Sequence, residues 1–149
     1  MNDDSGPSDA EQAALAQCVR AIGTATFHRA LLHVARAVCG FEHLSVFTFS
    51  QSFIPTIEVL EGLEDRSVTQ HSARSYLGFG YYGSDPATAR LQTLSSTADA
   101  PAVFVLRARD IRDDAYRHDI YERFGLDGRV SLIGRVEGRW RSVNFYKHV

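Results

Sequence analysis

The sequence predicts an α+β domain with a central, mostly antiparallel five-stranded sheet flanked by helices. Three observations support this class. Two helical patterns come before the first strand, further helical segments separate the later strands, and a hairpin pattern covers residues 130–146. Helices that gather on the faces of an antiparallel sheet are the usual packing solution for such an order.

The first half of the chain is expected to hold two helices and two strands. Apolar residues at helical spacing predict helices over residues 9–22 and 24–40. Gly40 ends the second helix, because glycine tolerates the left-handed backbone found there. A strand over residues 44–49 has apolar residues on both faces, as expected of a strand covered on both sides. A second strand is expected over residues 57–60.

The second half of the chain is expected to hold further helices and strands. In order, these are helices over residues 65–82 and 85–93, a strand over 103–106, a helix over 110–124, and strands over 130–136 and 140–146. Pro86 occupies the favoured first position of its helix. Residues 95–100 are expected to form a loop, and Glu137–Gly138 is typical of a hairpin turn.

Composition narrows the classes of protein that fit. The chain has 149 residues, of which 44% are apolar and 23% charged, as in ordinary globular domains. We expect a disordered lead over residues 1–8 and one domain over residues 9–149. A net charge of −2 argues against a surface built to hold nucleic acid. No apolar run approaches the roughly 20 residues of a membrane span, and the acidic start is unlike a signal peptide, so we expect a cytoplasmic protein without membrane contact.

No motif in the sequence indicates catalysis or a metal site. GxSxG, HExxH and a glycine-rich phosphate loop are all absent. Cys18 and Cys39 are expected to be buried free thiols. The six histidines form no i, i+4 pair, so we expect them to be structural. We therefore expect a protein that is not an enzyme and needs no cofactor; a haem sensor is an open alternative, because one axial histidine requires no motif.

One short segment carries the candidate ligand-binding residues. Tyr76, Tyr81 and Tyr82 precede Asp85, which is followed by Pro86. Aromatic rings with polar tips beside a carboxylate suit a pocket that holds an apolar body and fixes a polar head. A structural interpretation stands beside this one. Asp-Pro is a common helix start, so the carboxylate would only cap a helix, worth about 1 kcal/mol, and the aromatics would be core.

The spacing of this segment resembles the N-terminal autoinducer-binding domain of LuxR-type transcription regulators. That family has a tyrosine nine residues before an Asp-Pro pair and another aromatic about four before it, which are the offsets of Tyr76 and Tyr81 from Asp85. The resemblance implies a PAS- or GAF-like sensor fold with a role in quorum sensing. It also implies that Tyr76 donates to a carbonyl of an acyl-homoserine lactone and that Asp85 accepts from the amide. The sequence departs from the family at Ser72, where a tryptophan is typical.

The same resemblance implies partners and an output. We expect a small amphipathic signal molecule between sheet and helices, with Trp140 closing the pocket from the final hairpin. We also expect a homodimer formed through the leading helices, and DNA contact only through a separate helix-turn-helix domain that this sequence does not contain. The alternative is a ligand-independent dimerisation or protein-interaction module of the same fold. In that case the aromatics of residues 76–82 pack solidly, without a cavity of about 300 Å³.

Overall fold

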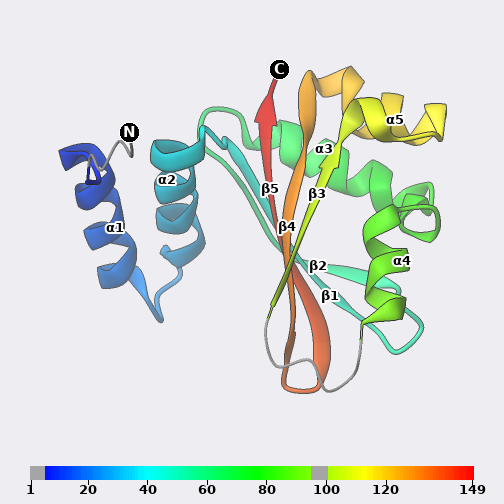
Figure 1. The fold of residues 1–149 in the computed structure, drawn as a ribbon, viewed down its shortest axis with the longest axis horizontal. Coiled ribbons are helices and arrows are strands. Elements are labelled where there is room, and N and C mark those ends of the chain that lie inside the picture. The colour runs from blue at the N-terminus through cyan, green and yellow to red at the C-terminus, as the bar shows by residue number, and fades with distance from the viewer. Residues whose placement is uncertain (1–5, 95–100) are drawn as a thin grey trace, which may run out of the picture.

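The computed structural model describes residues 6–94 and 101–149 (Figure 1). Its first elements are the helices α1 (Asp9–Ala21) and α2 (Phe27–Cys39) and the strands β1 (His43–Phe49) and β2 (Pro55–Gly62). The middle of the chain forms α3 (Arg66–Gly78), the 3-10 turn η1 (Tyr81–Gly83), α4 (Pro86–Thr93) and β3 (Ala102–Arg107). The last elements are η2 (Ala108–Asp110), α5 (Asp114–Ile120), η3 (Glu122–Phe124), β4 (Leu126–Val136) and β5 (Arg139–His148). The predicted α+β class is confirmed.

The strands form one five-stranded sheet in the order β2-β1-β5-β4-β3. Every neighbouring pair is antiparallel. The predicted final hairpin is the β4–β5 pair, which turns through Glu137 (φ 51°) and Gly138 (φ 78°). Positive φ at both turn residues matches the twist of the flanking strands. At the far end of the sheet, the start of β1 lies beside the end of β5, with His43 opposite Tyr146.

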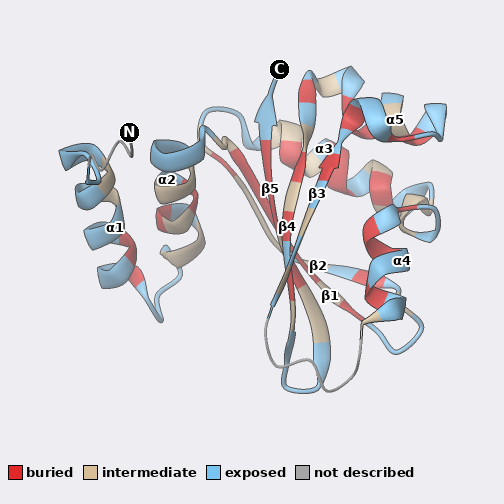
Figure 2. Ribbon diagram, viewed as in Figure 1, coloured by how far each residue is buried: buried red, intermediate tan, exposed pale blue. Residues whose placement is uncertain are grey.

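Helices lie on both sides of the sheet, with α2 and beyond it α1 on one side and α3, α4 and α5 on the other (Figure 1). The larger core lies on the α3–α5 side and includes Phe47 of β1. A smaller core on the other side packs Leu32 of α2 against Val46 of β1. Successive residues of β1 therefore enter different cores, so the prediction of a strand covered on both faces is confirmed. Figure 2 shows how buried residues are distributed over the sheet and the helices on either side of it.

The leading helix is attached to the rest of the domain mainly through α2. Cys18 is buried against α2, as predicted. Leu15, Val19 and Ile22 lie at helical spacing with Cys18 but are 56–65% exposed, because α1 packs on another helix and not on the sheet. Cys39 was expected to be buried and is exposed, because it lies in the last turn of α2. The expectation of a buried Cys39 thiol was therefore wrong.

Two helices are shorter than predicted. The helix expected over residues 65–82 ends at Gly78, because Gly80 adopts a left-handed backbone (φ 69°) before the η1 turn. The helix expected over residues 110–124 is divided. Only residues 114–120 are α-helical, and Asp113 caps them by accepting from the backbone N–H of Tyr116 at 3.0 Å.

Two segments that were expected to be irregular lie wholly or largely outside the described residues. The loop expected over residues 95–100 lies outside them, as does most of the lead expected over residues 1–8. Within the described residues, Ser8 and Glu11 form a reciprocal capping box at the start of α1. None of the helices in the described part of the chain is both long and apolar enough to cross a lipid bilayer.

Candidate functional site

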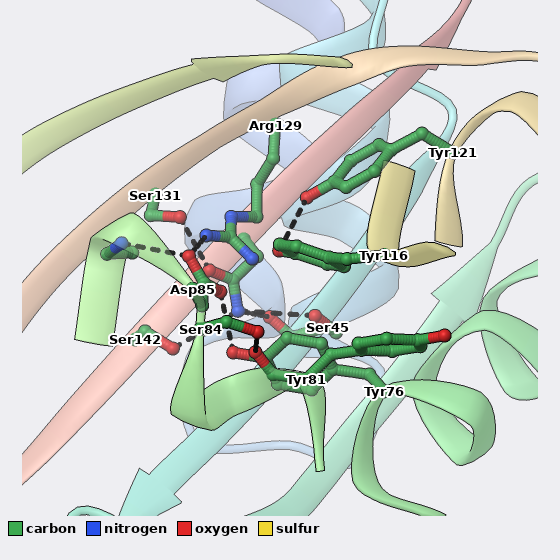
Figure 3. A network of polar contacts seen from close by, with 12 residues as sticks. Ser45, Tyr76, Tyr81, Ser84, Asp85, Tyr116, Tyr121, Arg129, Ser131 and Ser142 are labelled. Carbon is green, nitrogen blue, oxygen red and sulfur yellow. Dashed lines mark hydrogen bonds and ion pairs between the residues drawn. The ribbon is translucent and has the colours of Figure 1, made fainter. Parts of the chain in front are cut away.

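Asp85 lies at the centre of a buried polar cluster between the sheet and the helices that cover it (Figure 3). Its Oδ1 accepts from the backbone N–H of Ala87 at 2.8 Å, so Asp85 is the N-cap of α4. Its Oδ2 accepts from the Tyr76 hydroxyl at 2.6 Å. The turn at Gly80 lets the chain reverse between α3 and α4, which brings these two side chains together. Asp85 therefore has both roles, since it caps α4 and accepts a hydrogen bond from Tyr76.

Arg129 of β4 completes this cluster, and sequence reasoning missed it. Its Nη2 donates to Oδ1 of Asp85 at 2.8 Å, across 44 positions of sequence. The two side chains are 4% and 1% exposed, so this is a fully buried ion pair. The Asp85 carboxylate consequently accepts three hydrogen bonds from within the protein.

Burial and charge act in opposite directions on this ion pair. Burial raises the pKa of Asp85, but the charge and hydrogen bond of Arg129, with the hydrogen bond of Tyr76, outweigh it and hold that pKa below its ordinary value. Burial likewise opposes protonation of Arg129, but the Asp85 carboxylate keeps the pKa of the guanidinium well above its ordinary value. Burial, and then the nearby carboxylate, raise the pKa of Tyr76. The pair is therefore ionised and Tyr76 is a proton donor.

Further tyrosines enclose the guanidinium. Tyr116 and Tyr121 lie on one side of the cluster with their hydroxyl oxygens 3.5 Å apart (Figure 3). The hydroxyl of Tyr146 in β5 forms a hydrogen bond with the hydroxyl of Ser45, with the two oxygens 3.0 Å apart. Within the described residues, Nε of Arg129 is buried without a hydrogen-bond partner. A buried donor without a partner is costly, so this nitrogen is available to an acceptor that enters the cluster.

Small polar residues of the sheet line the floor beneath this cluster. Ser45, Asn144 and Ser131 are neighbours across β1, β5 and β4. The Ser131 hydroxyl donates to Oδ1 of Asn144 at 2.7 Å, and Nδ2 of Asn144 donates to the hydroxyls of Ser142 and Ser45 at 3.1 and 3.2 Å. All are buried. Short hydrogen-bonded side chains at these positions leave room for the large rings above them.

The other two predicted tyrosines lie in the same layer but point elsewhere. The Tyr81 hydroxyl donates to Oδ2 of Asp119 in α5 at 2.5 Å, and this hydrogen bond raises the pKa of Tyr81 to about 12. Its ring stacks on Tyr116 with centroids 5.3 Å apart. Tyr82 presents its ring edge-on to Tyr76 at 6.3 Å. Both residues support Tyr76 and Tyr116 and do not reach Asp85.

Trp140 lies apart from the Asp85 cluster, in the wall of an open groove of about 690 Å³. The apolar part of the wall comes from β1, the β1–β2 turn, α4 and β5, and consists of Phe49, Phe53, Leu91, Leu94 and Trp140. Polar residues of the strands and hairpin, including Glu58, Arg135 and Arg139, line the remainder. Helix α4 connects the two places, because Asp85 caps its start and Leu91 near its end lines the groove.

Comparison with solved structures identifies domains of the same fold. The structure is similar to the N-acylhomoserine-lactone-dependent LuxR family transcription factor CepR2 of Burkholderia cenocepacia, with a TM-score of 0.64 and 20% identity over 93% of this chain and 79% of that chain. It is also similar to the LBD domain of VqsR from Pseudomonas aeruginosa, with a TM-score of 0.64 and 18% identity over 95% of this chain and 82% of that chain. No family model and no curated protein matches the sequence. The resemblance to LuxR-type domains is therefore confirmed at the level of the fold.

Proposed function

We propose that this chain is a regulatory domain that senses a small amphipathic signal molecule, and that it is not an enzyme. The observation that carries the proposal is the 690 Å³ groove between the sheet and α4. Its volume lies within the range of about 300–1,000 Å³ that is typical of small-molecule sites. Its wall combines apolar and aromatic side chains with a few polar groups at the rim, the composition expected for an amphipathic ligand.

In this proposal, the apolar part of the signal lies against Trp140 and Leu91, and its polar head is directed along α4 toward Asp85. The helix has eight residues, which corresponds to about 12 Å, the scale of an extended acyl chain. To receive the head, Asp85 or Tyr76 must exchange an internal hydrogen bond for one to the ligand. A ligand carbonyl would accept from Tyr76 or from the unpaired Nε of Arg129, and a ligand amide would donate to Asp85. An acyl-homoserine lactone carries both groups.

The proposed output is a change in self-association through the leading helices. Leu15, Val19 and Ile22 give α1 an apolar face that is more than half exposed. Contiguous exposed apolar residues mark interaction surfaces. A ligand that binds only the folded state would raise the population of the form able to dimerise.

The test uses Trp140, which is the single tryptophan of the chain and lines the groove. Purified protein is titrated with acyl-homoserine lactones of increasing chain length while tryptophan emission and the thermal unfolding midpoint are recorded. A ligand at 100 times its Kd should add about 2.7 kcal/mol of stability, a shift of several degrees. We expect a chain-length-dependent change in both signals.

Matched variants separate the two parts of the site. Asp85→Asn keeps a good capping residue but removes the charge, and should abolish the response to ligand. Asp113→Asn makes the same change at the cap of α5, outside the cluster, and should leave the response intact. A panel without any response, with both variants equal to the parent protein, would contradict the proposal.

A second function has one observation in its favour. Tyr76 packs on Phe47 with ring centroids 5.7 Å apart and on Tyr116 at 6.1 Å, and the 690 Å³ groove is not lined by Tyr76, Tyr81 or Tyr82. Solid packing of these rings is what a ligand-independent dimerisation module requires. Dimerisation measured by analytical ultracentrifugation without any ligand, and lost in Val19→Glu, would favour this function over signal sensing.

A further inference from the structure

A pair of histidines closes the end of the sheet where β1 begins and β5 ends. His43 is the first residue of β1 and His148 is the last residue of β5. Their Nε2 atoms lie 2.9 Å apart, although 105 positions separate them in sequence. Oε2 of Glu42 lies 3.6 Å from Nε2 of His148. One ligand atom from each of the three side chains lies within 4.8 Å of the others.

We propose that Glu42, His43 and His148 bind a divalent transition-metal ion of the zinc class. Two imidazole nitrogens and one carboxylate oxygen form a donor set typical of zinc, with water in the fourth position. Zn–N and Zn–O bonds of about 2.1 Å at a tetrahedral angle separate two ligand atoms by about 3.4 Å. The spacings of 2.9 and 3.6 Å lie on either side of this value, and the third pair, Glu42 with His43, lies within 4.8 Å, so rotation of the partly exposed Glu42 and His148 side chains is what completes the geometry.

A hydrogen-bond chain behind His43 fixes which of its nitrogens faces the site. The Thr69 hydroxyl donates to the backbone carbonyl of Glu61 at 2.9 Å, because a carbonyl can only accept. Its single proton is then committed, so the hydroxyl accepts from Nδ1–H of His43 at 2.9 Å. Neutral His43 consequently presents the lone pair of Nε2 toward His148 and Glu42. A metal-ligating histidine is commonly oriented by such a hydrogen bond from its second nitrogen.

The backbone holds these ligands while leaving one side of the site open. The N–H of Glu42 donates to the carbonyl of Tyr146 at 2.9 Å, and His43 is paired on both sides within the sheet. His43 is 2% exposed, whereas the side chains of His148 and Glu42 are 41% and 28% exposed. An ion can therefore reach the three ligands from solvent and keep a bound water.

The charges around the cluster favour a cation. Glu42 supplies one negative charge, and Asp65, the N-cap of α3, lies close enough to His43 to act on it electrostatically. Among the described residues, Arg36 places a positive group nearby, with Nη2 at 4.0 Å from Oε1 of Glu42. The same nitrogen is closer to Glu64, at 3.0 Å, and the other Glu42 oxygen faces His148.

Without a metal, the short nitrogen–nitrogen contact requires one imidazole to donate to the other. Because Nε2 of His43 carries the lone pair, His148 donates its Nε2–H. The metal ion replaces this shared proton. His148 then carries its proton on Nδ1, by exchange with water at its exposed face, and both histidines remain neutral.

Isothermal titration of ZnCl₂ into protein stripped with EDTA tests the proposal. We expect one equivalent to bind and the thermal midpoint to rise by several degrees at 100-fold excess over Kd. His148→Ala removes a ligand at an exposed position and should abolish this binding. His118→Ala is the matched control, because His118 is also paired with a carboxylate, Glu122 at 3.8 Å, but no third ligand joins them among the described residues.

The role of Thr69 gives a second, independent readout. Thr69→Val removes the hydroxyl with little change of shape and should weaken zinc binding by about 10- to 100-fold, the usual effect of losing such a supporting hydrogen bond. Thr69→Ser should restore it, and circular dichroism checks that both variants are folded. Absence of stoichiometric binding, or binding that His148→Ala leaves unchanged, would overturn the proposal.

Discussion

The ion pair between Asp85 and Arg129 gives the sharpest test of how this domain is held together. Arg129→Met leaves a buried carboxylate without its counter-charge, and Asp85→Asn leaves a buried guanidinium without one. Removal of one partner from a buried pair costs about 3–5 kcal/mol, because the remaining charge stays desolvated. Asparagine still caps α4, so the second variant isolates the loss of charge from the loss of the cap.

The variant that combines Asp85→Asn with Arg129→Met gives the decisive prediction. It leaves no uncompensated charge in the core, so it should be more stable than either single variant. The coupling free energy should therefore be at least about 3 kcal/mol. Urea unfolding followed by tryptophan emission and circular dichroism gives the free energies of unfolding.

An exposed ion pair serves as the control. Arg141 and Glu58 lie 3.1 Å apart with side chains 40% and 34% exposed, so Arg141→Met should cost no more than about 1 kcal/mol. Additive losses for Asp85→Asn and Arg129→Met, or single losses as small as that of the control, would refute the view that burial makes this pair indispensable.

Three further predictions concern the same region. Tyr76→Phe removes the 2.6 Å hydrogen bond to the Asp85 carboxylate and should lower the free energy of unfolding by about 1.5–3 kcal/mol, more than Tyr81→Phe does, as measured in urea. The pKa of Asp85 is held below its ordinary value in the folded state, so its contribution to stability is complete only above about pH 5, starts to decline near the ordinary carboxyl pKa, and is lost as the pH falls through the lowered value. Thermal unfolding from pH 6 downward should then show a shallower loss of stability in Asp85→Asn than in the parent protein, and equal slopes would contradict this. Gly80→Ala should lower the free energy of unfolding by roughly 1 kcal/mol, because φ is 69° at that position. Gly78→Ala should raise it by about 0.5 kcal/mol, because a helical backbone accepts alanine. Effects of the same sign would show that the helix does not end between the two glycines.

The sequence predicted element types well because they depend on local patterns. Apolar spacing, the Asp-Pro helix start and the Glu137–Gly138 turn each act over a few residues, and the structure has the helices and strands that they indicate. Helix ends were less predictable. The early end of α3 depends on the left-handed conformation of Gly80, and glycine alone does not reveal which backbone region it occupies.

The candidate site was only half predictable, for a related reason. Tyr76 and Asp85 belong to the one segment that the sequence singles out, and they hydrogen-bond to each other, but the third member of the cluster comes from β4. An arginine just before an apolar strand pattern is the only signal of its burial, and strand ends carry charged residues routinely. Trp140 lines the groove near the other end of α4 from Asp85, and the sequence could not place it there because the hairpin register that positions it is set by packing across the sheet. The two histidines of the proposed metal site likewise meet only through β1–β5 pairing.

The position of β1 also determines when the sheet can form. This strand lies between β2, which follows it directly, and β5, the last strand in the sequence. On a ribosome, β1 and β2 can pair early, but one edge of β1 stays unpaired until residues 139–148 have been synthesised. Pairing of such distant segments slows folding, because a large loop must close before any contact is gained. The domain is therefore expected to fold late and cooperatively, with β1 exposed to mispairing until its final partner arrives.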